Sequence, residues 1–164
     1  MSNLNKIGFG GGCHWCTEGV FQSLKGVTQV DQGWISPDGL DASFSEGVIV
    51  TYDSGLITME VLIEIHLLTH ASASEHSMRA KYRSAVYVFD DGQRDQVQGI
   101  INAYKSNTGQ PIITQVLPMN SFRLNDEAFL NYYQTRPDAP FCTTYIDPKI
   151  KSLMRTHGEY LKSK

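Results

Sequence analysis

The stretch GFGGGCHWCTE, residues 8–18, joins the end of a strand, a run of glycines and the start of a helix. Residues 7–9 favour a short strand, and apolar side chains recur at helical spacing over residues 14–25 until Gly26 supplies a stop. Cys13 is therefore predicted at the junction where a strand turns into a helix N-terminus. The rest of the chain interleaves strand-favouring and helix-favouring segments in the same way.

The other predicted elements follow from hydrophobic periodicity and turn residues. Strands are predicted over residues 27–35, 47–52, 82–89 and 111–118, and helices over residues 59–68, 92–106, 126–134 and 147–162. A loop is expected between 69 and 81, and irregular structure over 136–142. The order β-α-β-β-α-β-α-β-α-α predicts an α+β fold, a two-layer α/β sandwich with a mixed sheet and a ferredoxin-like core.

Composition bounds the class of protein. The chain has 164 residues, of which 41% are hydrophobic and 19% charged, with a formal net charge of -3. This length fits one domain, expected over residues 1–164 with an irregular C-terminal segment at 135–164. The net charge gives no field for nucleic acid or an acidic membrane, so neither is expected as a partner. With no signal-peptide pattern and no apolar run long enough to span a bilayer, a cytoplasmic monomer is expected.

The glycines of residues 8–18 do not form a nucleotide site. Gly8 and Gly10 fit the start of the spacing G-x-G-x-x-G, but Cys13 stands at the third glycine. A phosphate loop would need Gly-Lys-Ser/Thr, which is absent. Haem attachment would need a histidine directly after the second cysteine, where Thr17 stands. No cofactor is therefore expected from this stretch.

The position of Cys13 favours thiol chemistry. Unpaired N–H groups and the positive end of a helix dipole stabilise a thiolate, which lowers a thiol pKa from its ordinary value of about 8.5. The flanking glycines let a substrate approach, and Trp15 would form an apolar wall beside the sulfur. Cys16, one turn into the same helix, is interpreted as a small buried filler.

Zinc is an alternative for the cysteines. Cys13 and Cys16 have the two-residue spacing of a zinc knuckle, and Cys142, His14 and His157 are further possible ligands. A strong zinc signal has a second closely spaced pair, which this chain lacks. No metal is therefore the preferred prediction, and a zinc-stabilised binding module stays open as a non-enzymatic alternative.

Together these segments resemble one family, the peptide methionine sulfoxide reductases of the A type. The family's nucleophile motif runs Gly-Gly-Cys-Phe-Trp, and residues 11–18 read GGCHWCTE here. Further segments match in order: VFQSLKGV, VTYDSGLITMEVLIEIHLLTH, KYRSAV and PIITQVLP. The combination is specific, although each piece alone is not.

The resemblance implies a reaction and the residues that perform it. The thiolate of Cys13 would attack the sulfur of a methionine S-sulfoxide, leaving a sulfenic acid and releasing methionine. Matched by position, Glu46 would donate a proton to the departing oxygen from a mostly apolar pocket, and Tyr82 would contact that oxygen. Without the resemblance, Glu46 is simply an exposed acid at a strand start, and Tyr82 a core aromatic.

The resemblance also implies a two-cysteine redox cycle of the kind that repairs oxidised proteins under oxidative stress. Cys142 resembles the C-terminal resolving cysteine of some family members, and its irregular surroundings would let it reach Cys13. Cys16 is the rival resolving thiol. Thioredoxin, or a similar dithiol protein, would reduce the resulting disulfide, with no metal or nucleotide required.

Three departures from the family pattern bear on the substrate. His14 replaces the usual Phe after the nucleophile, Trp34 replaces a tyrosine, and Ser77 stands where an aspartate is usual. His14, Trp15 and Trp34 are expected to contact substrate. His14 and Trp34 give the pocket polar groups that differ from those usual in the family. A different sulfoxide, or a peroxide, is therefore an alternative substrate.

Overall fold

The computed structural model describes residues 3–11, 14–40, 43–69, 83–109, 111–136, 138–140 and 142–162, without the side chains of residues 14, 16, 69 and 145. The strands are β1 (Leu4–Gly10), β2 (Val27–Ser36), β3 (Ser45–Asp53), β4 (Ala85–Val88), β5 (Gln115–Pro118) and β6 (Ser121–Leu124). The α-helices are α1 (His14–Gln22), α2 (Met59–Thr69), α3 (Asp91–Thr108), α4 (Tyr132–Thr135) and α5 (Asp147–His157). Short helical turns are η2 (Glu127–Phe129), η3 (Cys142–Ile146) and η4 (Gly158–Tyr160).

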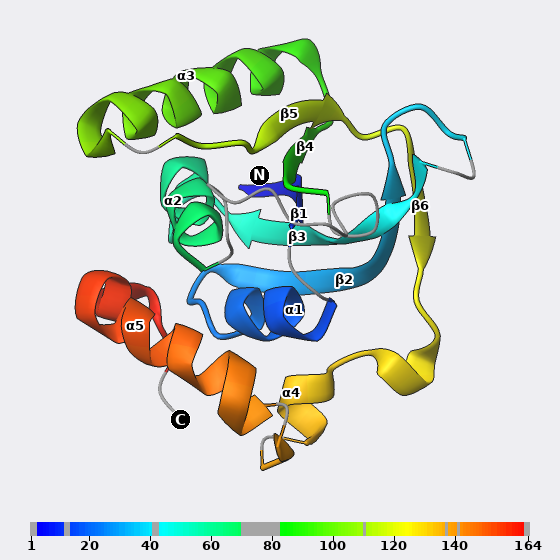
Figure 1. The fold of residues 1–164 in the computed structure, drawn as a ribbon, viewed down its shortest axis with the longest axis vertical. Coiled ribbons are helices and arrows are strands. Elements are labelled where there is room, and N and C mark those ends of the chain that lie inside the picture. Colours follow the sequence, from blue (N-terminus) through cyan, green and yellow to red (C-terminus); the bar gives the residue numbers. More distant parts are fainter. Residues whose placement is uncertain are drawn as a thin grey trace.

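The first half of the chain forms a ferredoxin-like core. Its elements run β1-α1-β2-β3-α2-β4, and the sheet order β5-β4-β1-β3-β2-β6 contains the run β4-β1-β3-β2 with every pair antiparallel. This is the arrangement of two interlocked split βαβ units. With β5 added parallel to β4, the sheet is mixed. The expected α+β sandwich with a mixed sheet and a ferredoxin-like core is confirmed (Figure 1).

Strand periodicity places the core on one face of this sheet. Ile7 and Phe9 of β1, and Val48 and Val50 of β3, alternate with residues of the opposite face and are all fully buried. They form one hydrophobic cluster with residues of α1, α2, α3 and α5. The opposite face has a smaller cluster centred on Tyr87, with side chains from β2, β5 and β6.

The two edges of the sheet converge at one corner. β5 and β6 lie at opposite ends of the strand order, yet only Met119 and Asn120 separate them in sequence. Three residue steps span at most about 11 Å, so the sheet must curl for both pairings to form. The backbone N–H of Met119 donates to the carbonyl of Val88 (2.8 Å), and that of Asn120 to the carbonyl of Ser36 (3.3 Å). In Figure 1 the long strand β2 bends towards β6 at this corner.

Several predicted boundaries are wrong. The strand expected over 82–89 is only Ala85–Val88, and that expected over 111–118 is only Gln115–Pro118. β6 was not predicted at all, because four residues that pair only at a bent strand end show too little alternation. The closing helix stops at His157 and continues only as the short turn η4. The loop expected at 69–81 lies outside the described residues, apart from residue 69, which ends α2.

The helix predicted over 126–134 is broken in two. Glu127–Phe129 forms a 3-10 turn, Leu130 is extended, and Asn131 adopts a left-handed backbone conformation (φ 56°) before α4 begins. A left-handed residue cannot continue a right-handed helix. The contacts that hold Asn131 there come from α1 and are described below.

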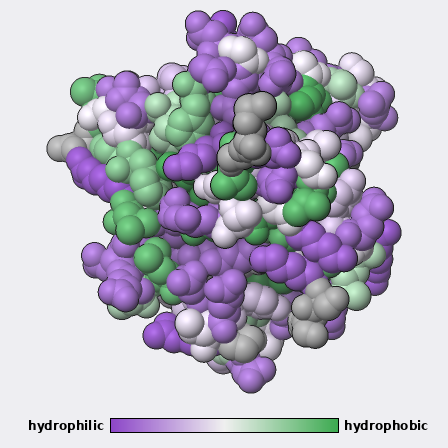
Figure 2. Space-filling model, turned by 180° about the vertical axis from the view of Figure 1, so that it is seen from behind, coloured by the Kyte–Doolittle hydropathy of each residue, from purple (hydrophilic) through white to green (hydrophobic). Residues whose placement is uncertain are grey.

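The outer surface is mixed in polarity. In Figure 2 polar residues cover most of the face seen, and hydrophobic residues form small groups between them. Among the helices of the described part of the chain, none is long and apolar enough to cross a membrane.

Candidate active site

Three backbone segments meet at Gly10, the last residue of β1. An ideal Cβ on Gly10 would lie 2.8 Å from the carbonyl oxygen of Arg83 and 3.2 Å from that of Glu46. Only glycine permits so close an approach, because neither carbonyl belongs to a side chain that can turn away. The hydroxyl of Ser45 accepts a hydrogen bond from the backbone N–H of Arg83 (2.8 Å), which joins the start of β3 to the segment before β4.

The carbonyl of Gly10 is bound from α2. His66, 2% exposed, donates from Nε2 to this oxygen at 2.7 Å, and its ring lies 4.8 Å from that of Phe9. A short hydrogen bond inside the core fixes the point at which the chain leaves β1. Gly10, three residues before Cys13 in the sequence, is therefore fixed to α2.

Glu46 is a buried acid, not an exposed one. It is 8% exposed on β3, and alternation puts it on the same face as Val48, which is the face covered by the helices. Its Cα partner on β2 is Trp34, so both side chains leave the sheet on that face. Trp34 is half-buried and pairs on its other side with Arg123 of β6.

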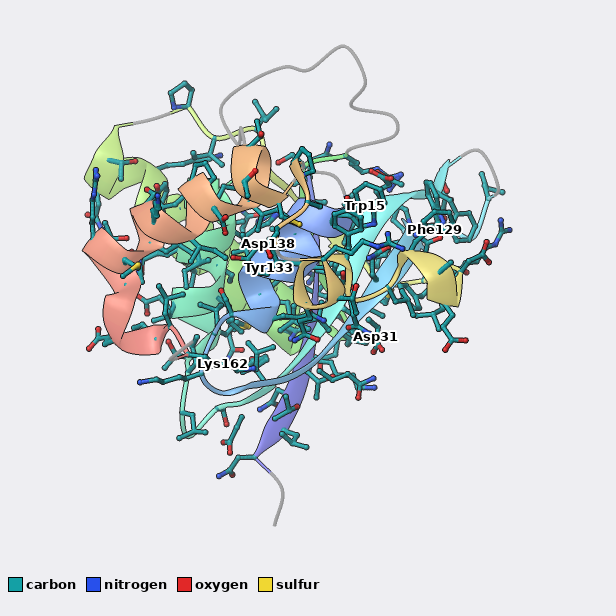
Figure 3. The ribbon with its side chains drawn as sticks, turned by 90° about the horizontal axis from the view of Figure 1, so that it is seen from below. Trp15, Asp31, Phe129, Tyr133, Asp138 and Lys162 are labelled. Carbon is teal, nitrogen blue, oxygen red and sulfur yellow. The ribbon has the colours of Figure 1, made fainter. Side chains whose placement is uncertain are left out.

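Trp15 projects from the first turn of α1 and is held by the chain after β6. Its Nε1 donates to the carbonyl of Phe129 (3.1 Å), and its ring stacks on that of Tyr132 with centroids 4.0 Å apart and planes 10° from parallel. Figure 3 shows Trp15, Phe129 and Tyr133 on the side where the C-terminal elements cross α1. Both end residues of the segment 129–132 thus contact the Trp15 side chain.

Two buried polar residues that the sequence interpretation did not single out hold this segment. Gln32, fully buried on β2, donates from Nε2 to the carbonyl of Phe129 (3.0 Å) and accepts from the side chain of Asn125 (2.7 Å). Glu18 is 0% exposed, and its two carboxylate oxygens accept from the backbone N–H groups of Asn131 (2.9 Å) and Tyr132 (3.1 Å). An acid on the inward face of α1 was the available signal for Glu18.

Cys142 lies in a helical turn, not in an irregular loop as expected. It is the first residue of η3, a single π turn that runs directly into α5, and it is 0% exposed. Burial, and then the nearby Asp147 carboxylate, raise the pKa of its thiol. The hydroxyl of Tyr133 donates a hydrogen bond to the carboxylate of Asp147, which joins α4 to the start of α5.

The turn η3 packs directly on α1. An ideal Cβ on Gly19 would lie 3.1 Å from Cβ of Tyr133 and 3.2 Å from Cγ2 of Ile146. Gly19 therefore allows α4 and η3 to approach the helix that follows Cys13.

The remaining predicted site residues fall outside this description. Cys13 and Tyr82 lie outside the described residues, as do the side chains of His14 and Cys16. Within the described ranges, no group of three His, Cys, Asp or Glu side chains is placed to hold a metal ion. Ser77 also lies outside them.

Comparisons with known proteins agree on one family. The family model described as peptide methionine sulfoxide reductase matches residues 5–161. The peptide methionine sulfoxide reductase MsrA of Deinococcus radiodurans is 31% identical over 170 residues, covering 94% of this chain and 82% of the relative. The MsrA of Sulfolobus acidocaldarius is 28% identical over 160 residues, covering 89% of this chain and 91% of the relative.

Solved structures share the fold. Reduced Mxr1 from Saccharomyces cerevisiae superposes with a TM-score of 0.75 at 19% identity, covering 87% of this chain and 91% of that one. Methionine sulfoxide reductase A of Corynebacterium diphtheriae gives a TM-score of 0.68 at 21% identity, with 85% and 78% covered.

Family match and fold together define the class of protein, an oxidoreductase that uses thiols to reduce methionine sulfoxide. The chain belongs to the peptide methionine sulfoxide reductase family.

Proposed function

We propose that the chain reduces the S epimer of methionine sulfoxide, free or in peptides, at a centre formed by Cys13, Glu46 and Tyr82. The convergence of backbones at Gly10 carries this proposal, because an ideal Cβ on Gly10 would lie only 2.8 Å from the carbonyl oxygen of Arg83 and 3.2 Å from that of Glu46. Cys13 follows Gly10 by three residues, a reach of at most about 11 Å, and Tyr82 directly precedes Arg83. All three proposed groups thus branch from one junction.

The chemistry uses one thiol to remove one oxygen. The Cys13 thiolate attacks the sulfoxide sulfur while Glu46 gives a proton to the oxygen, with the Tyr82 hydroxyl bonded to it. The protonated sulfoxide oxygen then passes as a hydroxyl group from the methionine sulfur to the Cys13 sulfur, forming a sulfenic acid. Methionine leaves with the electron pair of the sulfur–sulfur bond. The sulfoxide gains two electrons and Cys13 loses two. The burial of Glu46 on the helix-covered face supports its part, because a side chain held inside the fold can be presented to the substrate in one fixed position.

Trp15, Trp34 and His14 form the walls of the proposed substrate site. Trp15 is held by a hydrogen bond and a stacked ring, which suits a fixed wall for the substrate's methyl group. Trp34 is the cross-strand neighbour of Glu46.

The proposed resolving residue is Cys142, with Cys16 as the rival. Cys142 attacks the sulfenic sulfur of Cys13, releasing water and forming a disulfide. Its place on η3, packed against α1, brings it near the helix that follows Cys13. Its thiol is buried and its pKa is raised by that burial, so an opening of η3 would favour both formation of the thiolate and its access to Cys13.

We propose thioredoxin as the reductant that reopens the disulfide. A crystal structure of yeast Mxr1 in complex with Trx2 has a TM-score of 0.62 to this chain at 20% identity, covering 76% of this chain and 83% of that one. No prosthetic group or metal enters the cycle. The proposed setting is the cytoplasm, with the protein acting as a monomer and with no nucleic acid or membrane partner.

A stoichiometric reaction tests the mechanism. Fully reduced protein is mixed with excess methionine S-sulfoxide and no reductant, and both the methionine formed and the thiols lost are counted. One methionine and two thiols lost per chain are expected, and peptide mapping identifies the joined pair. The R epimer serves as the control substrate.

Three cysteine variants separate the roles. Cys13→Ser is expected to abolish methionine formation, and full turnover by it would refute the mechanism. Cys142→Ser is expected to give one methionine per chain but no recycling by thioredoxin, whereas Cys16→Ser should recycle normally. The reverse pattern would make Cys16 the resolving thiol.

A second candidate is reduction of a different sulfoxide or a peroxide, because Trp34 lies directly across from Glu46 in place of the family tyrosine. Turnover of a small non-methionine sulfoxide far above that of methionine sulfoxide would favour it. One zinc per chain in protein purified without chelator would instead favour the binding module built on Cys13, Cys16 and Cys142.

A further inference from the structure

We infer that Glu18 is a positioning residue, which fixes the plane of the Trp15 indole by holding the segment 129–132 against α1. The inference rests on the proposed function only where it assigns Trp15 to the substrate wall. Glu18 is assigned no part in the chemical step and acts through the segment that it holds.

The first step is the contact between Glu18 and the backbone. Each carboxylate oxygen accepts one N–H, from Asn131 at 2.9 Å and from Tyr132 at 3.1 Å, inside a fully buried site. Hydrogen bonds from N–H to an ionised carboxylate are about twice as strong as neutral ones. A side chain with two acceptors and no donor fits two adjacent N–H groups, whereas the amide of glutamine would turn a donor towards one of them.

The second step links this segment to Trp15. The Tyr132 ring, whose backbone N–H Glu18 binds, stacks on the Trp15 indole at 4.0 Å. At the other end, the Phe129 carbonyl accepts from Trp15 Nε1 at 3.1 Å and also from Gln32 Nε2 at 3.0 Å. The indole is therefore held at its face and at its edge by one short segment.

The third step is the common face of α1. Trp15, Glu18 and Gln22 follow one another at spacings of three and four residues, which puts them in a row along one side of a helix. Gln22 donates to the Asn131 side chain at 2.8 Å, an additional contact to the same segment. Glu18 occupies the middle of this row and is its buried member.

The consequence is an effect on substrate binding more than on chemistry. If the segment loosens, the indole loses its stacked ring and its hydrogen bond, while Glu46 keeps its place on β3. Glu18→Gln is expected to raise KM for methionine S-sulfoxide about tenfold with kcat changed by less than about threefold.

Fluorescence tests the positioning independently of activity. In a Trp34→Phe background Trp15 is the sole tryptophan, so its emission maximum and its quenching by acrylamide report its surroundings. Glu18→Gln in that background is expected to shift emission to longer wavelength and increase quenching. The exposed Glu60→Gln is the matched control and should change neither. Unchanged emission and quenching in folded Glu18→Gln protein overturn the inference.

A double-mutant cycle decides whether Glu18 acts through Trp15. If it does, adding Glu18→Gln to Trp15→Phe produces little further rise in KM. Additive effects in the cycle overturn the inference. If Glu18→Gln does not fold, Tyr132→Leu removes the stacked ring while leaving Glu18 in place, and the same fluorescence and KM changes are required of it.

A failure of the proposed function can be distinguished from a failure of this inference. If fluorescence changes in Glu18→Gln while KM is unaffected by both Glu18→Gln and Trp15→Phe, Glu18 positions Trp15 as inferred. In that case Trp15 is not a wall of the substrate site.

Discussion

The sheet and the C-terminal segment over residues 125–162 are held together in different ways. The strands β1 to β4 share continuous ladders, and their inward side chains join one hydrophobic cluster. The C-terminal segment consists of separate helical pieces attached to α1 by individual side-chain hydrogen bonds, such as those of Glu18 and Gln22. Only Ile146 and Leu153 among its hydrophobic side chains, together with Cys142, are buried within the described part of the segment.

The difference separates two proposed tasks. Groups that must keep a fixed geometry, such as Glu46, belong to strand ends of the sheet. Cys142, which must move to reach Cys13 in the proposed cycle, belongs to the segment with fewer buried contacts. Regions with few buried contacts open at lower free energy than core strands.

The largest expected effect removes the proposed acid from the sheet. Glu46→Gln keeps the shape of the side chain but cannot give up a proton in the same way, so kcat should fall by about 10²–10⁴-fold. The measurement is single-turnover formation of methionine. The control is Glu127→Gln, an exposed acid of η2, expected to stay within about twofold. Undiminished kcat in Glu46→Gln would refute the proposed catalytic role of this acid.

A glycine series compares the two regions by stability. Gly10→Ala sets a methyl 2.8 Å from a backbone oxygen of the sheet, so the free energy of unfolding should fall by about 2–4 kcal/mol. Gly19→Ala meets only C-terminal side chains, at 3.1 and 3.2 Å, and should cost about 1 kcal/mol or less.

Gly99→Ala on α3 is the control for this series. Its Cβ meets nothing within 4 Å, so alanine should raise stability by about 0.5–1 kcal/mol. Urea unfolding measures all three. Equal losses for Gly10 and Gly19 would show that the two regions are equally rigid.

Loosening the C-terminal segment should expose Cys142. Tyr133→Phe removes the hydrogen bond to Asp147, which contributes about 1 kcal/mol, so alkylation of Cys142 should accelerate roughly fivefold. Mass spectrometry of the Cys142 peptide follows the reaction in Cys13→Ser protein. Tyr104→Phe on α3 is the control. An unchanged rate in Tyr133→Phe would mean that opening of η3 does not depend on this bond.

The smallest effect is a pH dependence of stability. Burial raises the pKa of the Cys142 thiol, so the unfolded chain ionises there at lower pH than the folded chain. The contribution is fully present below the ordinary thiol pKa of about 8.5 and is lost as pH rises through the folded value. Cys142→Ala should flatten the decline of unfolding free energy as pH rises above about 8.5. An equally steep decline in the variant would contradict the assignment.

Sequence periodicity was sufficient where local pattern and tertiary environment agree. Ile7 and Phe9, or Val48 and Val50, alternate strictly because one face of their strands is covered by helices. The family resemblance, confirmed by the match over residues 5–161, added a reaction that periodicity cannot supply.

Tertiary contacts decided the remainder. Local propensity favours a helix through residues 126–134, but two N–H groups bound by Glu18, more than a hundred residues earlier, stop it at Asn131. β6 exists only because the sheet curls at Met119 and Asn120. Tertiary contacts also decided the burial of Glu46 and of Cys142, because an acid at a strand start and a cysteine near prolines are typical of exposed positions. By itself the sequence determined the sheet's central strands and the family. Only the tertiary structure decided what surrounds Trp15 and Cys142, because those surroundings come from residues far away along the chain.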